Sequence, residues 1–121
     1  MADTGAGDEQ LKVTVEFGGG LDMFVKKERL QMVDGAKKAI VRMARQTGGK
    51  GTTIRRLIEH IGEDYLKAST DLFCTGSTLR PGILVIINDA DWEITDDGMD
   101  KYDYKLQDED EIVFVSTLHG G

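Results

Sequence analysis

Alternating apolar and polar positions predict a β-strand near the beginning of the sequence. Residues 11–17 read Leu-Lys-Val-Thr-Val-Glu-Phe, and this period of two is typical of a strand with one face in a core. Three consecutive glycines follow at 18–20 and indicate a turn, because glycine adopts positive φ without steric cost. We expect a second strand at about 27–33, so that the two strands form an N-terminal β-hairpin.

Residues 34–51 fit two interpretations. Apolar residues fall on one side of a helical projection and basic residues on the other; the apolar set is Ala36, Ala39, Ile40, Met43 and Ala44. The segment is therefore expected to be a short helix or an extension of the second strand. Glycines at 48, 49 and 51 indicate that it ends in a flexible loop.

The main helix is predicted from residue 54 onward. Apolar residues recur there at helical spacing, namely at Ile54, Leu57, Ile58, Ile61 and Leu66. Thr52 or Thr53 can cap this helix, because a threonine hydroxyl accepts a hydrogen bond from a backbone N–H of the first turn.

Two short apolar runs predict the other main strands. Residues 83–87 are rich in β-branched side chains, which suits a strand. Residues 112–115 are apolar at every position, which favours a central place in the sheet. The first and last strands can pair in parallel, because a long connection separates them. With one helix to cover one sheet face, the pattern predicts an α+β fold of the β-grasp (ubiquitin-like) type with a mixed sheet.

The length of 121 residues suits one domain with one core. We expect a flexible N-terminal tail at 1–10, a folded domain at 11–116 and a flexible C-terminal tail at 117–121. The first ten residues lack the basic and apolar regions of a signal peptide, and no run approaches the roughly 20 apolar residues of a membrane helix. Cys74 is the only cysteine, so no internal disulfide can form and a reducing, cytoplasmic location is expected.

Charge is distributed unevenly along the chain. The formal net charge is −7, which disfavours non-specific binding to nucleic acid. Residues 35–58 nevertheless carry seven basic side chains and no acidic one, whereas residues 89–111 carry eleven acidic side chains and two lysines. Such segments orient a partner or simply form solvated faces.

Several patterns resemble active or metal sites but do not match them. His60 and His119 cannot be placed in a catalytic triad. Residues 48–52 lack the Lys-Ser or Lys-Thr pair of a phosphate loop, and residues 89–93 lack the glycine and the distal glutamate of a calcium loop. Cys74 fits a packed thiol better than a nucleophile. The sequence therefore predicts no catalytic residue, no metal site and no bound cofactor.

The terminal Gly120-Gly121 pair is the strongest candidate for chemistry. A terminal carboxylate is ionised at neutral pH and is a poor electrophile, so a separate ATP-using enzyme must activate it before it can accept sulfur or an amine. Residues 117–121 span roughly 17 Å when extended, enough to enter a buried channel. The two glycines have no side chains and therefore fit a narrow part of such a channel. Leu118 can anchor the tail, and His119 can form a hydrogen bond.

Three segments carry a resemblance to a known family: Val15–Asp22, Arg80–Glu93 and Ser116–Gly121. On these residues the chain resembles the ubiquitin-related modifier family, the sulfur carriers and protein modifiers of eukaryotes. The likeness covers most of the chain. The departure is a basic segment at about 35–50, longer than the usual link between the second strand and the helix. We interpret it as an insertion. It leaves the tail chemistry unchanged, but it leaves undecided whether the surface next to it binds a partner.

The resemblance implies a β-grasp carrier and co-substrate, not an enzyme. An E1-like activating enzyme with a rhodanese domain would adenylate Gly121 with ATP, and a sulfur donor would convert it to a thiocarboxylate. Thr117, Leu118, His119 and Gly120 would be recognised in the tail.

The resemblance also implies where the activated group goes. The sulfur would pass, through a tRNA thiolation enzyme complex, to the wobble uridine of cytosolic tRNAs as 2-thiouridine. The same terminus would become attached to lysines of target proteins. We expect a cytoplasmic monomer without membrane contact or direct tRNA binding.

Two alternatives remain open at this point. The small sulfur-carrier subunit of a molybdopterin synthase shares the fold and the Gly-Gly end, but would form a stable complex with a large catalytic subunit. Residues 89–93 and the Thr-Leu-His before Gly120 favour the modifier. A binding module that contacts RNA through basic residues 37–56 is the third hypothesis.

Overall fold

The computed structural model describes residues 10–47, 50–67, 72–91 and 101–117. Its centre is a six-stranded sheet in the order β2-β3-β1-β10-β8-β9. β1 and β10 run parallel, and the other neighbours are antiparallel. The strands are β1 (Gln10–Gly18), β2 (Gln31–Val33), β3 (Ala36–Ala44), β8 (Ile83–Ile87), β9 (Ala90–Asp91) and β10 (Glu111–Ser116).

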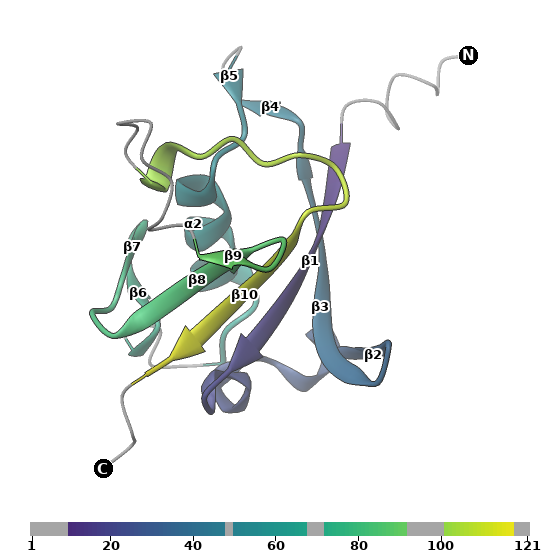
Figure 1. The fold of residues 1–121 in the computed structure, drawn as a ribbon, viewed down its shortest axis with the longest axis vertical. Helices are drawn as coiled ribbons and strands as arrows, with labels where there is room; N and C mark the ends of the chain where they lie inside the picture. Colours follow the sequence, from purple (N-terminus) through teal and green to yellow (C-terminus); the bar gives the residue numbers. More distant parts are fainter. Residues whose placement is uncertain (1–9, 48–49, 68–71, 92–100, 118–121) are drawn as a thin grey trace.

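The helix α2 (Ile54–Asp64) lies across one face of this sheet (Figure 1). Short elements complete the description: the 3-10 turns η1 (Leu21–Phe24), η2 (Lys27–Arg29) and η5 (Lys101–Asp103), and two small hairpins, β4 (Gln46–Thr47) with β5 (Lys50–Gly51) and β6 (Cys74–Thr75) with β7 (Thr78–Leu79). A sheet with one helix layer is the α+β, β-grasp architecture that the sequence predicts.

The core lies between α2 and the sheet. Every second residue of β1 from Leu11 to Phe17 is buried there, as the alternating pattern predicts. Three phenylalanines join the sheet to the segment after the helix: the ring centroid of Phe73 lies 5.1 Å from that of Phe114 and 6.1 Å from that of Phe17. Such edge-to-face pairs add to the stabilisation from buried apolar area.

Several local predictions are confirmed. Thr53 caps α2, and its side-chain oxygen accepts a hydrogen bond from the Arg56 N–H at 3.3 Å. β10 occupies the centre of the sheet between β1 and β8, which explains why residues 112–115 are apolar on both faces. Residues 83–87 form β8 as expected.

The basic segment after residue 34 is a sheet strand and not a helix. β3 pairs antiparallel with β1 from Gln10↔Ala44 to Glu16↔Lys38. Buried residues at 39, 41 and 43 recur with a period of two, which is the period of a strand. This period is not visible when the same residues are placed on a helical projection. Much of the segment at 35–50, interpreted from sequence as an insertion, is therefore an integral strand.

The expected second strand at 27–33 is shorter than predicted. Only Gln31–Val33 form β2, and Lys27–Arg29 form the 3-10 turn η2. The hairpin partner of β1 is consequently β3. Leu66 is buried but follows the end of α2, where it forms an isolated bridge with Val25.

Candidate functional site

The described part of the predicted tail is its first residue, Thr117, directly after β10. Its backbone N–H donates to the Gly82 carbonyl oxygen at 2.8 Å, and its side-chain Oγ1 donates to the same oxygen at 2.7 Å. The other predicted site residues, Leu118, His119, Gly120 and Gly121, lie outside the described residues. The chain is thus anchored one residue beyond the end of the sheet.

The acceptor for Thr117 sits in a tight turn. The Ile83 N–H donates to the Arg80 carbonyl at 3.3 Å, and Gly82 between them has φ +96°. With Pro81 before it, this is the pattern of a type II turn, which requires positive φ at its third residue. The Arg80 N–H in turn donates to the carbonyl of the buried Phe73 at 2.9 Å, so the turn is fastened to the core.

A second glycine contacts the same junction from the side of β1. Gly19 has φ +67°, and a Cβ there would lie 2.3 Å from the carbonyl oxygen of Ser116. Only a residue without a side chain permits this close backbone approach. We call Gly19, Gly82 and Thr117 the collar. The sequence signalled its parts as Gly-Gly-Gly and Arg-Pro-Gly turns, but sequence reasoning did not connect them with the tail.

The sheet face opposite α2 is apolar next to the collar. β8 and β10 place four half-buried side chains there in two registered pairs, Val113↔Ile86 and Val115↔Leu84. They alternate with the fully covered residues that face the helix, because successive side chains of a strand point to opposite faces. A half-exposed apolar surface therefore lies next to the point where the tail begins.

The acidic turn at the other end of β10 is built around a buried carboxylate. Asp110 is 6% exposed and accepts hydrogen bonds from Asn88 Nδ2 at 2.9 Å, the Tyr104 hydroxyl at 3.0 Å and the Gln107 N–H at 2.9 Å. Burial, together with this hydrogen bond, raises the pKa of Tyr104 to about 12. Asp110 thus serves the fold, although by sequence it belongs to the acidic segment 89–111, which was expected to orient a partner or to form a solvated face.

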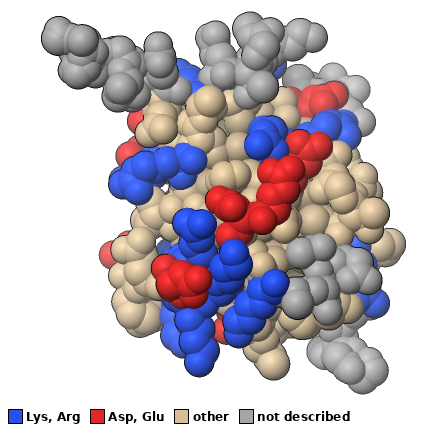
Figure 2. All heavy atoms as spheres, turned by 180° about the vertical axis from the view of Figure 1, so that it is seen from behind, with Lys and Arg blue, Asp and Glu red and all other residues tan. Residues whose placement is uncertain are grey.

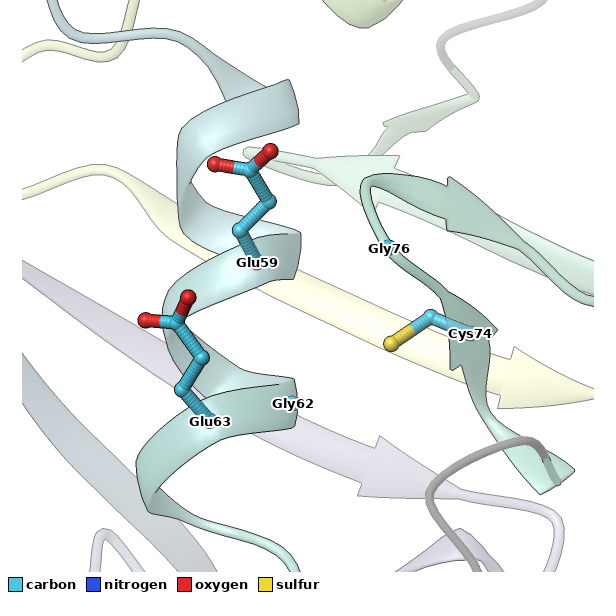
Figure 3. A pocket seen from close by; sticks show the side chains of 5 residues that line it. All are labelled: Glu59, Gly62, Glu63, Cys74 and Gly76. Carbon is cyan, nitrogen blue, oxygen red and sulfur yellow. The ribbon is translucent and has the colours of Figure 1, made fainter.

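Cys74 is a packed thiol, in agreement with the sequence interpretation. It is 4% exposed, and Figure 3 shows its sulfur directed toward α2. A Cβ on Gly62 would lie 3.0 Å from that sulfur, so the glycine lets the helix approach. Burial raises the pKa of the thiol, which lowers its thiolate fraction and its reactivity. A shallow hollow beside it is lined by Glu59, Gly62, Glu63, Cys74 and Gly76.

The described histidine is also explained by packing. The His60 ring lies edge-on to Tyr65, with 5.5 Å between ring centroids. Burial lowers the pKa of His60. Within the described ranges, no group of three or more His, Cys, Asp or Glu residues is placed to hold a metal ion.

Among the helices that the structure describes, none has the length and apolar character needed to cross a bilayer.

The basic and acidic segments of the sequence meet in the fold. Arg55 pairs with Asp103 at 3.4 Å and Arg45 with Asp108 at 4.0 Å, which joins the segment 35–58 to the segment 89–111. Figure 2, which shows the molecule from behind, has a band of acidic side chains directly beside a cluster of basic ones. The pairs are exposed and contribute little stability individually, about 0–1 kcal/mol. Their effect is to neutralise part of the predicted charge asymmetry.

Comparison with known proteins places this geometry in a family. The sequence model of Urm1 (Ubiquitin related modifier) matches residues 12–121. The chain is 44% identical over 111 residues to Ubiquitin-related modifier 1 of Gallus gallus, covering 92% of this chain and 96% of that protein. It is also 44% identical over 111 residues to Ubiquitin-related modifier 1 of Homo sapiens, with the same coverage.

The solved structures agree with the sequence comparisons. The solution structure of Urm1 from Trypanosoma brucei has a TM-score of 0.66 and 34% sequence identity to this chain, and the match covers 93% of this chain and 97% of that one. The fold is thus shared with a relative of clear sequence similarity. On the matched sequence and the matched fold together, the chain belongs to the ubiquitin-related modifier family.

Proposed function

We propose that this protein is a ubiquitin-like sulfur carrier and protein modifier whose reactive group is the C-terminal carboxylate of Gly121. The observation that carries the proposal is membership of the modifier family over residues 12–121, together with a described structure in which β10 leads straight into the tail. The packed environments of the half-buried His60 and the buried Cys74 support it further, because neither residue is arranged as an active site. The chain acts as a co-substrate of an activating enzyme.

The proposed chemistry has three steps. A carboxylate oxygen of Gly121 attacks the α-phosphorus of ATP, and pyrophosphate leaves to give the acyl-adenylate. The terminal sulfur of a persulfide donor then attacks the acyl carbon and AMP leaves. A second thiol cleaves the resulting S–S bond, which releases the thiocarboxylate and leaves a disulfide on the donor. ATP and the sulfur donor are used by the E1-like enzyme with its rhodanese domain, and the carrier itself needs no bound cofactor.

Two classes of acceptor follow from an activated acyl group. Through a tRNA thiolation enzyme complex, the thiocarboxylate sulfur would reach C2 of the wobble uridine in cytosolic tRNAs. A lysine amine of a target protein would instead attack the acyl carbon of the activated Gly121 and form an isopeptide bond, expelling AMP from the adenylate or hydrogen sulfide from the thiocarboxylate. Both roles belong to a carrier that works in the cytoplasm.

The activating enzyme is expected to dock on the apolar sheet face. Val115 and Leu84 lie beside the collar, so an enzyme that draws the tail into its active site covers them at the same time. Burial of such half-exposed apolar side chains stabilises a complex by roughly 25 cal/mol per Å² removed from water, before the entropic cost of association. Leu118 and His119 would then be read inside the channel, and the two glycines would pass its narrow part.

An intact-mass assay tests the function directly. The protein is incubated with the activating enzyme, ATP and a sulfur donor, and its mass is measured. We expect replacement of one oxygen by sulfur at Gly121, with no such change when ATP is left out. A variant without Gly121 is the matched control, because it keeps the whole folded domain. A wild-type mass that stays unchanged, with an enzyme shown to be active on another carrier, rules the proposal out.

A further inference from the structure

We propose that the collar fixes the point at which the tail leaves the domain and so positions the tail for the activating enzyme. This proposal rests on the proposed function. It assigns Gly19, Gly82 and Thr117 a positioning role, which differs from direct recognition of Thr117 by the enzyme.

The first support is the double hydrogen bond of Thr117. The last registered pair of the β8–β10 ladder is Ser116↔Ile83, so the Thr117 N–H bond to Gly82 adds one rung to that ladder. Strand ends fray readily, because few contacts oppose local opening there. The second bond, from Oγ1 to the same oxygen at 2.7 Å, opposes fraying at the residue where the tail begins.

The second support is that the acceptor is itself held in place. Gly82 lies in a turn closed by the Ile83 N–H and Arg80 carbonyl, and Arg80 is bonded to Phe73. Phe73 is 1% exposed and packs edge-on against Phe114 of β10. The oxygen that receives Thr117 is therefore positioned by the core and not by a free loop.

The third support is Gly19 on the opposite side. If residue 19 had a side chain, its Cβ would lie 2.3 Å from the Ser116 carbonyl oxygen and 2.9 Å from the Ser116 nitrogen. The junction between strand and tail is thus enclosed by backbone on both sides. Sideways movement of Ser116 toward the glycine turn is blocked by atoms already in contact.

A fixed junction between the domain and the tail affects how tightly the tail binds the enzyme. Four residues, 118–121, remain to enter the enzyme, and they span roughly 14 Å when extended. If the junction frays, Thr117 and Ser116 join the segment that must be ordered on binding. Ordering extra residues costs conformational entropy and weakens the complex without changing the chemistry that follows. The collar should therefore act on KM for the carrier and leave kcat unchanged.

The first test compares Thr117→Val with Thr117→Ser. Valine keeps the shape but removes the hydroxyl, and serine restores it. ATP–pyrophosphate exchange by the activating enzyme is measured at 25 °C over a range of carrier concentrations. We expect Thr117→Val to raise KM about fivefold, the factor that corresponds to the loss of one hydrogen bond, with kcat as in wild type. Thr117→Ser should return KM to near the wild-type value.

The second test compares Gly19→Ala with Gly20→Ala. Both glycines have positive φ, +67° and +90°, but a Cβ at Gly20 meets nothing within 4 Å. Alanine at 20 therefore reports the cost of the backbone conformation alone, and alanine at 19 adds the collision with Ser116. We expect a larger KM for Gly19→Ala than for Gly20→Ala. Thermal unfolding shows whether each variant is folded at 25 °C, and the pair of Thr117 variants decides the matter if Gly19→Ala does not fold.

Hydrogen exchange separates positioning from recognition. The backbone amide of residue 117 should exchange faster in Thr117→Val and Gly19→Ala than in wild type, after correction for the intrinsic exchange rate of each sequence. A higher KM without faster exchange would mean that the enzyme contacts Thr117 directly, and wild-type KM values in both variants would mean that the collar has no role in activation; either result overturns the proposal. If the activating enzyme showed no ATP–pyrophosphate exchange with the wild-type carrier, that result would instead refute the proposed function.

Discussion

Asn88 and Asp110 tie together the turn that follows β8 and the turn that precedes β10. The Asn88 side-chain amide donates to Asp110 at 2.9 Å, while its oxygen accepts the Glu111 N–H at 2.9 Å. The Asn88 N–H also donates to the Glu111 carbonyl at 2.8 Å. This end of the sheet is therefore held by a polar network around the buried Asp110, and the end with the collar by backbone contacts together with the Thr117 hydroxyl.

Replacing Asp110 with asparagine should destabilise the domain. The Asp110 Oδ2 atom accepts from both Tyr104 and the Gln107 N–H, and an asparagine amide group cannot satisfy all three donors. A buried donor left without a partner costs about 1–3 kcal/mol. Urea unfolding should show a loss of that size for Asp110→Asn. Glu109→Gln, at an exposed neighbour, should stay within about 0.5 kcal/mol of wild type. Equal stability of the two variants would contradict the structural role of Asp110.

Stability should fall on mild acidification because of His60. Burial lowers the pKa of His60 in the folded state, so the unfolded chain binds the proton more readily. The His60 contribution is fully present above the unfolded-state pKa of about 6.5 and is lost as the pH falls through the lower folded-state value. The free energy of unfolding should thus decrease from pH 7.5 to pH 5.5, and decrease less in His60→Gln. If the free energy of unfolding had the same pH dependence in wild type and in His60→Gln, His60 would be excluded as the cause of the decrease.

Gly62 and Cys74 should be energetically coupled. Alanine at 62 gains about 1 kcal/mol of helix propensity over glycine, but its Cβ lies 3.0 Å from the Cys74 sulfur. In a Cys74→Ala background the sulfur is gone, and Gly62→Ala should become more favourable by at least about 0.5 kcal/mol. A double-mutant cycle from urea unfolding measures this difference. If the effects of Gly62→Ala and Cys74→Ala on the free energy of unfolding were additive, α2 would be able to move away from the Cys74 sulfur without an energetic cost.

Direct tRNA binding through the basic segment is not expected. A deletion of residues 35–50 cannot test this, because it removes the core strand β3 and should unfold the protein. Lys37→Ala and Lys38→Ala leave the buried residues of β3 in place. We predict that binding to tRNA at 50 mM and 150 mM salt is weak and the same for wild type and the double variant. A tighter wild-type complex with a steeper salt dependence would establish an RNA contact.

Periodic patterns predicted the fold where one structural period dominated. The alternation at 11–17 gives β1, the spacing from Ile54 to Ile61 gives α2, and the uniformly apolar residues 112–115 indicate the central strand. Residues 36–44 were ambiguous, because alanines at 36, 39 and 44 fit a helical stripe as well as a strand. Pairing with β1 decided between the two, and such long-range pairing is not encoded in a local window.

The collar shows a second limit of sequence reasoning. The Gly-Gly-Gly and Arg-Pro-Gly turns are recognisable as turns, but they lie more than sixty positions apart in the sequence. Their common contact with residues 116 and 117 exists only after β1 and β8 have assembled on either side of β10. Of the tail itself, the described structure includes only the first residue, so the roles of Leu118 to Gly121 stay predictions.

The parallel pairing of β1 with β10 has a consequence for biosynthesis. Its register runs from Thr14↔Glu111 to Gly18↔Val115, so the first and last of the described sheet strands along the sequence lie side by side in the middle of the sheet. A nascent chain or a product truncated before residue 111 lacks the strand that joins both halves, and contacts so distant in sequence form late. Thr117 finds its acceptor only after that closure, so under the proposed function a completed sheet is required before the tail can be presented to the activating enzyme.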